Sequence, residues 1–246
     1  MKFNGEIKGG VTFLHKQSES TSFEQLYVAL REKEERILSD EEVKALPYLS
    51  IGAHVEEWKL RAETAQRYRN YLTDFKGKTI LEIGCGNGWF SNFMAQSGDF
   101  EVVAQDVNVT ELKQASHLFP NSNIQWVFTE DLSLFPKAAF NLIVFNASIQ
   151  YFPDIVELLN TVTPLLTANG EIHVLDSPVY SSEKEAESAK QRTVDYYTSM
   201  GFSALSANYN HHTRDNFKAF EQLYKPSIWN KFKGNRNPFP WLRFQK

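Results

Sequence analysis

The stretch at residues 79–91 limits what this chain can fold into more than any other. It reads TILEIGCGNGWFS, a β-branched and apolar run followed by three alternate glycines, Gly84, Gly86 and Gly88. Apolar residues then recur at helical spacing, so the stretch predicts a strand, a tight turn and a helix. Glycines let the backbone pass close beneath a ligand, and the helix points its free N–H groups at whatever lies over the turn. The stretch therefore predicts a site for a nucleotide-like ligand.

The glycine spacing distinguishes between kinds of nucleotide site. A dinucleotide fingerprint needs Gly-x-Gly-x-x-Gly, but here the third glycine comes one residue early and Trp89 stands in its place. The sequence Gly-x-x-x-x-Gly-Lys-Ser/Thr does not occur, which excludes a P-loop. A nicotinamide-dependent oxidoreductase is therefore a disfavoured alternative.

The pattern Glu82-x-Gly84-x-Gly86-x-Gly88 resembles motif I of the class I S-adenosylmethionine (SAM) dependent methyltransferases, with Glu82 in the acidic position. The resemblance extends from Thr79 to Asp176. It implies that SAM is the cofactor and S-adenosylhomocysteine the product. It also implies that the loop residues contact the cofactor, namely Glu82, Gly84, Cys85, Gly86, Asn87 and Gly88.

From residue 79 onward the chain alternates expected strands and helices, which is typical of a parallel sheet covered on both faces. The strands are expected near residues 79–83, 101–106, 124–128, 140–146 and 170–175, with a closing pair at 202–209 and 239–244. This count resembles the seven-stranded methyltransferase sheet, whose last strand is antiparallel. We predict an α/β fold with a doubly wound, mostly parallel seven-stranded sheet in three α/β/α layers.

Residues 1–75 form a predicted N-terminal helical extension. The first 20 residues are polar and weakly patterned, and helices are expected at about 23–37, between Ser39 and Pro47, and at about 53–73. In the methyltransferase family such helices commonly cover the cofactor. We therefore predict a cap over the active site at 1–75 and a SAM-binding domain at 76–246, with Trp58 and Arg61 helping to close the cofactor site.

The composition restricts the partners of the chain. A net charge of −4 disfavours sequence-independent nucleic-acid binding. The single cysteine, Cys85, and the spacing of the six histidines give no metal site, so no metal is expected. The first ten residues lack the apolar core of a signal peptide and no run of 18 apolar residues occurs, so we expect a cytoplasmic protein without a membrane segment. A monomer and a homodimer both remain open.

Acidic residues near the ends of the next strands are candidates for further cofactor contacts. Asp106 ends a strand 18 residues after Gly88, near the distance at which nucleotide folds place an acid on ribose hydroxyls. The alternative is a loop aspartate that caps the following helix. By resemblance, Asp106 and Val107 would contact the ribose side, Asn146 would lie near the methyl group, and the adenine would be contacted from a segment of open register, Glu130, Asp131 and Leu132.

The region after the fourth strand limits the acceptor. Asn146-Ala-Ser-Ile replaces the Asp/Asn-Pro-Pro-aromatic sequence of enzymes that methylate nucleic-acid amines, and the Pro-Cys nucleophile of cytosine C5 enzymes is missing. We therefore predict O- or N-methylation of a small molecule. A SAM-binding protein without transfer activity and a methyltransferase acting on a macromolecule remain the alternatives.

The residues expected around the acceptor come from the carboxyl ends of the later strands. Gln150, Tyr151 and Tyr209 are predicted to bind it. His211 is the predicted base for a hydroxyl acceptor, with Tyr180 and Asp176 as substitutes, and the alternative is a pure positioning mechanism. After Glu221 basic and aromatic residues alternate with no acid. This pattern suits either an anionic acceptor or packing of the last strands.

Overall fold

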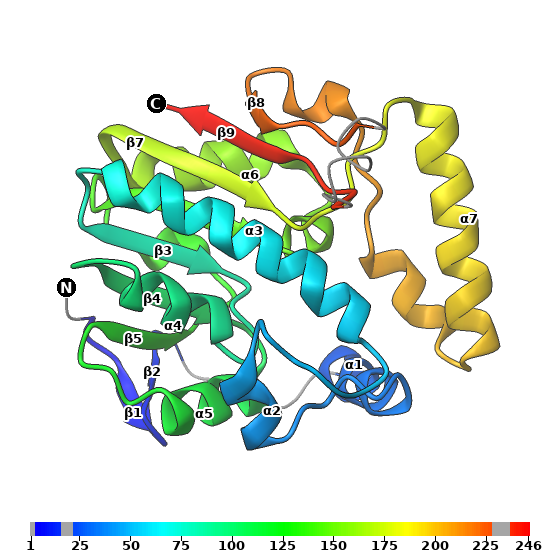
Figure 1. Ribbon diagram of the computed structural model, residues 1–246, viewed down its shortest axis with the longest axis horizontal. Coiled ribbons are helices and arrows are strands. Elements are labelled where there is room, and N and C mark those ends of the chain that lie inside the picture. Colours follow the sequence, from blue (N-terminus) through cyan, green and yellow to red (C-terminus); the bar gives the residue numbers. More distant parts are fainter. Residues whose placement is uncertain (1–2, 16–21, 228–236) are drawn as a thin grey trace.

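A mixed sheet runs through the centre of the chain and confirms the predicted α/β class (Figure 1). The computed structural model describes residues 3–15, 22–227 and 237–246. Within these ranges the strand order is β1-β2-β5-β4-β3-β6-β7-β9-β8. Strands β2 to β7 are parallel, whereas β1 is antiparallel to β2, and β9 is antiparallel to both β7 and β8. The strands are β1 (Glu6–Lys8), β2 (Val11–Phe13), β3 (Thr79–Ile83), β4 (Glu101–Asp106), β5 (Ile124–Phe128), β6 (Phe140–Asn146), β7 (Leu166–Leu175), β8 (Glu221–Tyr224) and β9 (Trp241–Gln245).

Helices cover both faces of the sheet because its strands are apolar on both sides. Ile80 belongs to the apolar cluster that α3, α4 and α5 cover, whereas the next residue, Leu81, belongs to the cluster that α6 covers. Figure 1 shows α3 crossing the front of the sheet and α6 behind it, which gives the predicted three layers. The α-helices of the described residues are α1 (Ser22–Lys33), α2 (Asp40–Ala45), α3 (Val55–Asp74), α4 (Trp89–Gln96), α5 (Val109–Leu118), α6 (Ile155–Val162) and α7 (Glu183–Ser199).

Local sequence signals explain where several helices begin. Ser39 and Glu42 form a capping box at the start of α2. The side chains of Asp154 and Ser182 accept backbone hydrogen bonds at the starts of α6 and α7. The helix expected at 23–37 ends earlier, at Lys33, and Glu35 then takes a positive φ of 55°.

The strand predicted at 202–209 is wrong. Those residues form a 3-10 helix, η4 (Ser203–Asn208), in which Leu205 is buried three residues after the partly buried Phe202. Small residues separate these two apolar side chains, and a spacing of three suits a helical turn rather than a strand. The strand that closes the sheet beside β9 is instead β8, whose four residues are too few to carry a clear alternation.

The N-terminal segment is not only helical, so the predicted count of seven strands is also wrong. Strands β1 and β2 add a short antiparallel pair beyond β5 and bring the sheet to nine strands in the described residues. All three residues of β2 are buried, whereas those of β1 are exposed. Two strands of three residues each give no readable period, which is why the sequence did not indicate them.

The carboxyl ends of the parallel strands meet at one edge of the sheet, on the right of Figure 1. Helices α1 and α7 lie at this edge, together with the amino-terminal end of α3. Tyr196 of α7 donates a 2.8 Å hydrogen bond to Glu34, just after α1, and Lys33 reaches the carbonyl oxygen of Met200 at 3.0 Å. Elements far apart in the sequence therefore enclose the edge where ligands bind in open α/β sheets.

Candidate active site

Three neighbouring strands turn sharply at this edge. The residues directly after β3, β6 and β7 are Gly84, Ala147 and Asp176, with φ angles of 76°, 54° and 45°. A non-glycine residue in this conformation costs roughly 1–3 kcal/mol and persists where the surroundings impose it, often at ligand sites. The two strained residues and the glycine loop therefore mark the same edge as functional.

A cavity of about 440 Å³ lies over the glycine loop. Its volume falls within the range of small-molecule sites. Ten of the residues predicted for the cofactor line it, and they come from α3, the glycine loop, the end of β4, the loop after β5 and the end of β6. They are Trp58, Arg61, Gly84, Cys85, Gly86, Asn87, Asp106, Val107, Glu130 and Asn146.

The glycines of the loop have different surroundings. A Cβ on Gly84 would lie 2.5 Å from Ser148, and one on Gly88 would lie 2.4 Å from Trp126, so both positions are filled by packing. The atoms nearest to a Cβ on Gly86 would be those of the Glu111 carboxylate, at 3.6 Å. Gly86 therefore faces the cavity, and its missing side chain leaves room for a ligand.

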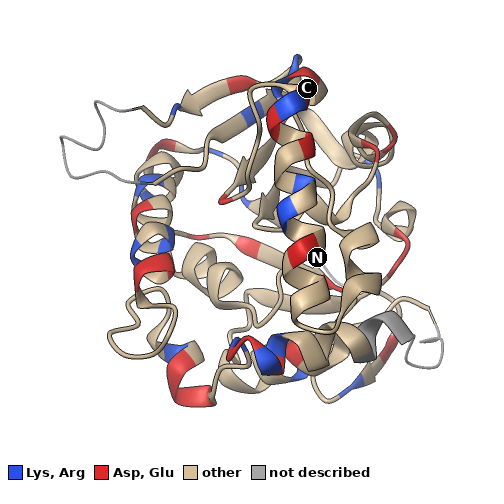
Figure 2. Ribbon diagram, turned by 90° about the vertical axis from the view of Figure 1, so that its right-hand side faces the viewer, with Lys and Arg blue, Asp and Glu red and all other residues tan. Residues whose placement is uncertain are grey.

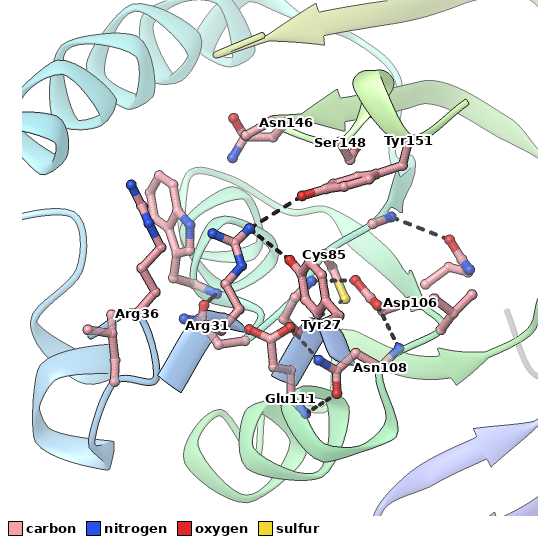
Figure 3. Close-up of a pocket in the computed structure, with 18 of the residues that line it drawn as sticks. Tyr27, Arg31, Arg36, Cys85, Asp106, Asn108, Glu111, Asn146, Ser148 and Tyr151 are labelled. Atoms are coloured by element: carbon pink, nitrogen blue, oxygen red, sulfur yellow. Dashed lines mark hydrogen bonds between the residues drawn. The ribbon is translucent and has the colours of Figure 1, made fainter. Parts of the chain in front are cut away.

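Asp106 is held in a fixed orientation beside this glycine. Its carboxylate accepts hydrogen bonds from the backbone N–H groups of Gly86 and Asn108, each at 2.7 Å. Figure 3 shows Asp106 at one end of the cavity, next to Asn108 and Glu111. A carboxylate fixed at the end of β4, the strand that follows the glycine loop and α4, fits the hydroxyls of a ribose.

Glu111 is a cavity residue that the sequence reasoning missed. It lies in the first turn of α5, lines the cavity and accepts a 3.0 Å hydrogen bond from the side chain of Asn108. Burial, and then the nearby charge of Asp106, raises its pKa to about 7. The signal in the sequence was the short spacing from Asp106, since the first turn after a strand end faces the same ligand.

Four residues predicted for the cofactor do not line the cavity: Glu82, Gly88, Asp131 and Leu132. Glu82 lies beneath the loop, where Ser91 of α4 donates a hydrogen bond to it, and burial raises its pKa to about 8 despite that bond. Asp131 is exposed and accepts from the backbone of Ser133, and Leu132 is buried in the second apolar cluster. Of the three residues proposed to contact the adenine, Glu130, Asp131 and Leu132, Glu130 is the one that lines the cavity.

Two of the N-terminal helices contribute to the wall of the cavity. They supply Tyr27 and Arg31 from α1 and Trp58 and Arg61 from α3. The guanidinium of Arg31 donates to the hydroxyls of Tyr27, at 2.8 Å, and Tyr151, at 3.3 Å, as Figure 3 shows. Arg61 lies over the ring of Trp58, 5.2 Å from its centroid. No motif marked Tyr27 or Arg31 in the sequence.

A second cavity of about 450 Å³ adjoins the first. The two share Arg31, Arg36, Glu57, Arg61, Ala147 and Tyr151 as wall residues. The second cavity extends toward α7, and most of the residues predicted for the acceptor side lie on its wall. They are Gln150, Tyr151, Asp176, Tyr180 and Tyr209.

His211, the predicted base, lines neither cavity. Its Nε2 pairs with the hydroxyl of Thr193 at 2.9 Å, and its ring packs against those of Tyr180 and Tyr209. Burial lowers its pKa. The imidazole therefore lies behind two tyrosines that do line the second cavity.

The charges around this edge are mixed. Figure 2, which looks onto the edge, shows basic and acidic residues interspersed along the helices rather than gathered on one basic face. Lys231, Lys233 and Arg236 of the basic C-terminal segment lie outside the described residues. In the part of the chain that the structure describes, no three His, Cys, Asp or Glu side chains are grouped as a metal ion would require, and no helix has the length and apolar character to cross a membrane.

Comparison with known proteins agrees with this geometry. The family model of the methyltransferase domain matches residues 57–220, which is 164 of 246 residues. An uncharacterised methyltransferase of Mycobacterium bovis is 28% identical over 97 residues, 39% of this chain and 49% of that protein. The chain spans about half the length of the first curated relatives that it matches.

Two solved structures have a similar fold. Phosphoethanolamine N-methyltransferase 2 of Haemonchus contortus, in complex with phosphomonomethylethanolamine and S-adenosylhomocysteine, has a TM-score of 0.57 at 16% identity, covering 82% of this chain and 47% of that one. A geranyl diphosphate methyltransferase, in complex with its diphosphate and sinefungin, also has a TM-score of 0.57, at 11% identity and 76% and 79% coverage. The chain therefore belongs to the SAM-dependent methyltransferases of the class I fold.

Proposed function

We propose that the protein binds SAM in the first cavity and transfers its methyl group to a small molecule held in the second. The observation that carries this proposal is the pair of adjoining cavities at the carboxyl edge of the sheet. The first suits the cofactor of the family, and the second begins where the methyl group would face. A protein that only bound SAM would have no use for the second cavity.

The first cavity fits SAM by its donor set. Gly86 has no side chain that would enter the cavity, and the carboxylate of Asp106, held by two backbone N–H groups, would accept from the ribose hydroxyls. Glu130 is the residue that the adenine would meet at the end of β5. Trp58 and Arg61 close the other side, where a guanidinium suits a carboxylate such as that of the amino-acid end.

Helices α1 to α3 form the cap in this proposal, whereas β1 and β2 belong to the sheet. This divides the first 75 residues differently from the helical extension expected from the sequence. Arg31 joins the cap to the sheet edge because it bonds Tyr27 within α1 and Tyr151 after β6. Cap and sheet edge together would exclude water from the bound cofactor.

When bound, SAM supplies a methyl group that is already activated, so the chain has mainly to position the acceptor. Gln150, Tyr151 and Tyr209 line the cavity where the acceptor would lie. His211 is set back behind Tyr180 and Tyr209, so a proton from the acceptor would go to Asp176 or Tyr180 rather than to the imidazole.

Transfer of label from methyl-labelled SAM to fractions of a cell extract tests this function. We expect S-adenosylhomocysteine to form and the label to appear in the small-molecule fraction. Binding of S-adenosylhomocysteine without any transfer would support a SAM-binding protein instead. Label in the macromolecular fraction would support a methyltransferase that acts on a protein or nucleic acid.

A further inference from the structure

Three buried side chains at the carboxyl edge each present an acceptor oxygen without a partner. They are Asn146 Oδ1, Gln150 Oε1 and Asp176 Oδ2, none of which has a hydrogen-bond partner among the described residues. The side chains are 7%, 7% and 5% exposed. Buried polar groups in native proteins are nearly always bonded, so each orphan oxygen points to a missing donor.

The orphan oxygens lie on the walls of the two adjoining cavities. Asn146 lines the first, and Gln150 and Asp176 line the second. Asn146 immediately precedes the strained Ala147, and Asp176 is itself strained. Strained backbone and unsatisfied oxygens therefore coincide at the ends of β6 and β7, where a ligand would supply what the chain lacks.

The remaining polar atoms of two of these side chains are already engaged, which fixes the orphan oxygens in place. Gln150 Nε2 donates to the carbonyl oxygen of Ala147 at 2.6 Å, so its amide cannot turn without losing this bond. Asp176 Oδ1 accepts from the hydroxyl of Thr64 at 2.6 Å. The edge thus offers acceptors and calls for a ligand rich in donors.

An ammonium group matches this demand better than a hydroxyl does. An ammonium carries up to three N–H donors, whereas a hydroxyl donates once and would leave two of the three oxygens unpaired. The carboxylate of Asp176 adds a negative charge, on which the guanidinium groups of Arg61 and Arg67 already act, and its unpaired oxygen can accept from a cation. The edge therefore suits a nitrogen as the acceptor atom.

The wall that the second cavity shares with the first is rich in arginine and has the opposite character. Three arginines and two glutamates alternate there, with N–O distances of 3.4, 3.6, 2.8 and 2.7 Å along the chain from Arg31 through Glu34, Arg36 and Glu57 to Arg61. All five residues line the second cavity. In the proposed function Arg61 serves the cofactor, so the two carboxylates balance Arg31 and Arg36, and the positive charge left for an acceptor is that of Arg192, which also lines this cavity.

Helix α7 and Tyr209, which follows η4, add donors to the second cavity. Arg192 lines the second cavity, as do the hydroxyl-bearing Tyr197 and Tyr209. Burial raises the pKa of Tyr197 to about 12 and that of Tyr209 higher still, so both hydroxyls remain protonated donors at neutral pH. Arginine and tyrosine donors around an excess positive charge form a site for a carboxylate or phosphate.

We propose that the acceptor is an amine with a carboxylate or phosphate at its other end, bound with its nitrogen at Asn146, Gln150 and Asp176 and its anion among the arginines, and methylated on that nitrogen. This deepens the proposed function and rests on it. The ammonium gives a proton to the Asp176 carboxylate, the nitrogen lone pair forms the N–C bond, and the S–C bond breaks with its electron pair left on sulfur.

The test is calorimetric binding of four probes to the protein saturated with S-adenosylhomocysteine. β-Alanine and ethanolamine phosphate carry both groups, whereas propionate carries only the anion and ethanolamine only the amine. We expect the double-ended probes to bind roughly tenfold or more tightly than either single-ended probe, as expected when a charged hydrogen-bonding group is added. Equal binding of double- and single-ended probes, or no binding of the double-ended ones, would overturn the acceptor class.

Two variants assign the two ends of the acceptor. Asp176→Asn should weaken ethanolamine more than propionate, and Arg192→Gln should do the reverse. Lys190→Gln is the matched control for Arg192→Gln because Lys190 lies on the same helix, exposed and away from the cavity. Equal losses for both single-ended probes in either variant would contradict the assignment.

Binding of S-adenosylhomocysteine to each variant shows whether the variant is folded, and Gln150→Leu repeats the test of the amine end if Asp176→Asn does not fold. The same measurement on the unaltered protein separates the two proposals. If S-adenosylhomocysteine does not bind, the proposed function fails. If it binds and the probes are not distinguished, only the acceptor class fails.

Discussion

Two groups of buried polar side chains differ in one respect, one in the middle of strand β7 and the other at the ends of β6 and β7. In the middle of β7, Glu171 accepts hydrogen bonds from Tyr71 and, at 3.0 Å, from His173, while Trp241 donates to the other nitrogen of His173 at 2.9 Å. Just past its end, Asp176 keeps an oxygen without a partner among the described residues. Both sites are desolvated, but only the first is satisfied within the chain.

The comparison shows how a structural polar group differs from one that waits for a ligand. Trp241 fixes the histidine tautomer because its N–H occupies Nδ1, which leaves the proton of His173 on Nε2, facing Glu171. Burial lowers the pKa of His173, and the imidazole stays neutral. The hydrogen bonds of Glu171 and His173 are thus satisfied within the chain. At the edge, Asn146, Gln150 and Asp176 each keep one oxygen without a partner among the described residues.

Replacement of His173 by Leu should give the largest effect. It would leave the Trp241 N–H and one hydrogen-bonding position of Glu171 unpaired in the core, so we expect a loss of about 3–5 kcal/mol in the free energy of unfolding. Urea denaturation measures it. A loss below about 1 kcal/mol, the worth of an ordinary hydrogen bond, would mean that the interior group is not the closed network described above.

Asp106→Ala tests the cofactor end of the site. The loss of a carboxylate that bonds ribose hydroxyls should weaken S-adenosylhomocysteine binding by roughly 1.5–3 kcal/mol in calorimetry. Asp131→Ala is the matched control, since Asp131 is an exposed acid that does not line the cavity. If the two variants bind alike, Asp106 does not contact the cofactor.

Glu82 is intermediate between the two groups in its hydrogen bonding. It is fully buried, and Ser91 donates one hydrogen bond to its carboxyl group. Its pKa is raised from 4.5 to about 8, so the folded state holds a proton that the unfolded state has lost in this range. Stability should therefore fall as pH rises from 4.5 to 8, with a slope of at most about 1.4 kcal/mol per pH unit from this group. Unfolding at several pH values should show a flatter dependence in Glu82→Gln. An unchanged slope would remove Glu82 as its source.

Gln150→Met should give the smallest effect on stability. The orphan oxygen disappears at similar volume, so the free energy of unfolding should stay within about 1 kcal/mol of the original value. Thermal unfolding without ligand measures it, with His173→Leu as the contrasting interior variant. A loss above about 2 kcal/mol would show that the edge group is satisfied by the chain after all.

The sequence was enough to place the centre of the sheet and one end of the cofactor site. Strands β3 to β7 are long apolar runs with turn signals between them, and Gly86 and Asp106 lie at fixed spacing in that pattern. Such features are local in the chain. They could therefore be predicted without knowledge of what packs on them.

The cap and the arginine-rich wall of the second cavity could not be predicted in the same way. Tyr27, Arg31 and Arg192 reach the cavities only because α1 and α7 come together at the sheet edge. Nothing in their local sequence separates them from surface residues. The misplacement of Glu82 has a related cause, since the alternation of a strand does not say which face the glycine turn leaves open.

The short strands at the two borders of the sheet have a consequence for association. The outermost strands, β1 and β8, have three and four residues, and β1 carries an exposed Lys8–Glu6 ion pair. A long bare strand would invite a second chain to continue the ladder, whereas a short charged one offers few aligned backbone groups. From the edges that the described residues form, we therefore expect partners of this protein, including further copies of itself, to meet it through helices and loops rather than by extending its sheet.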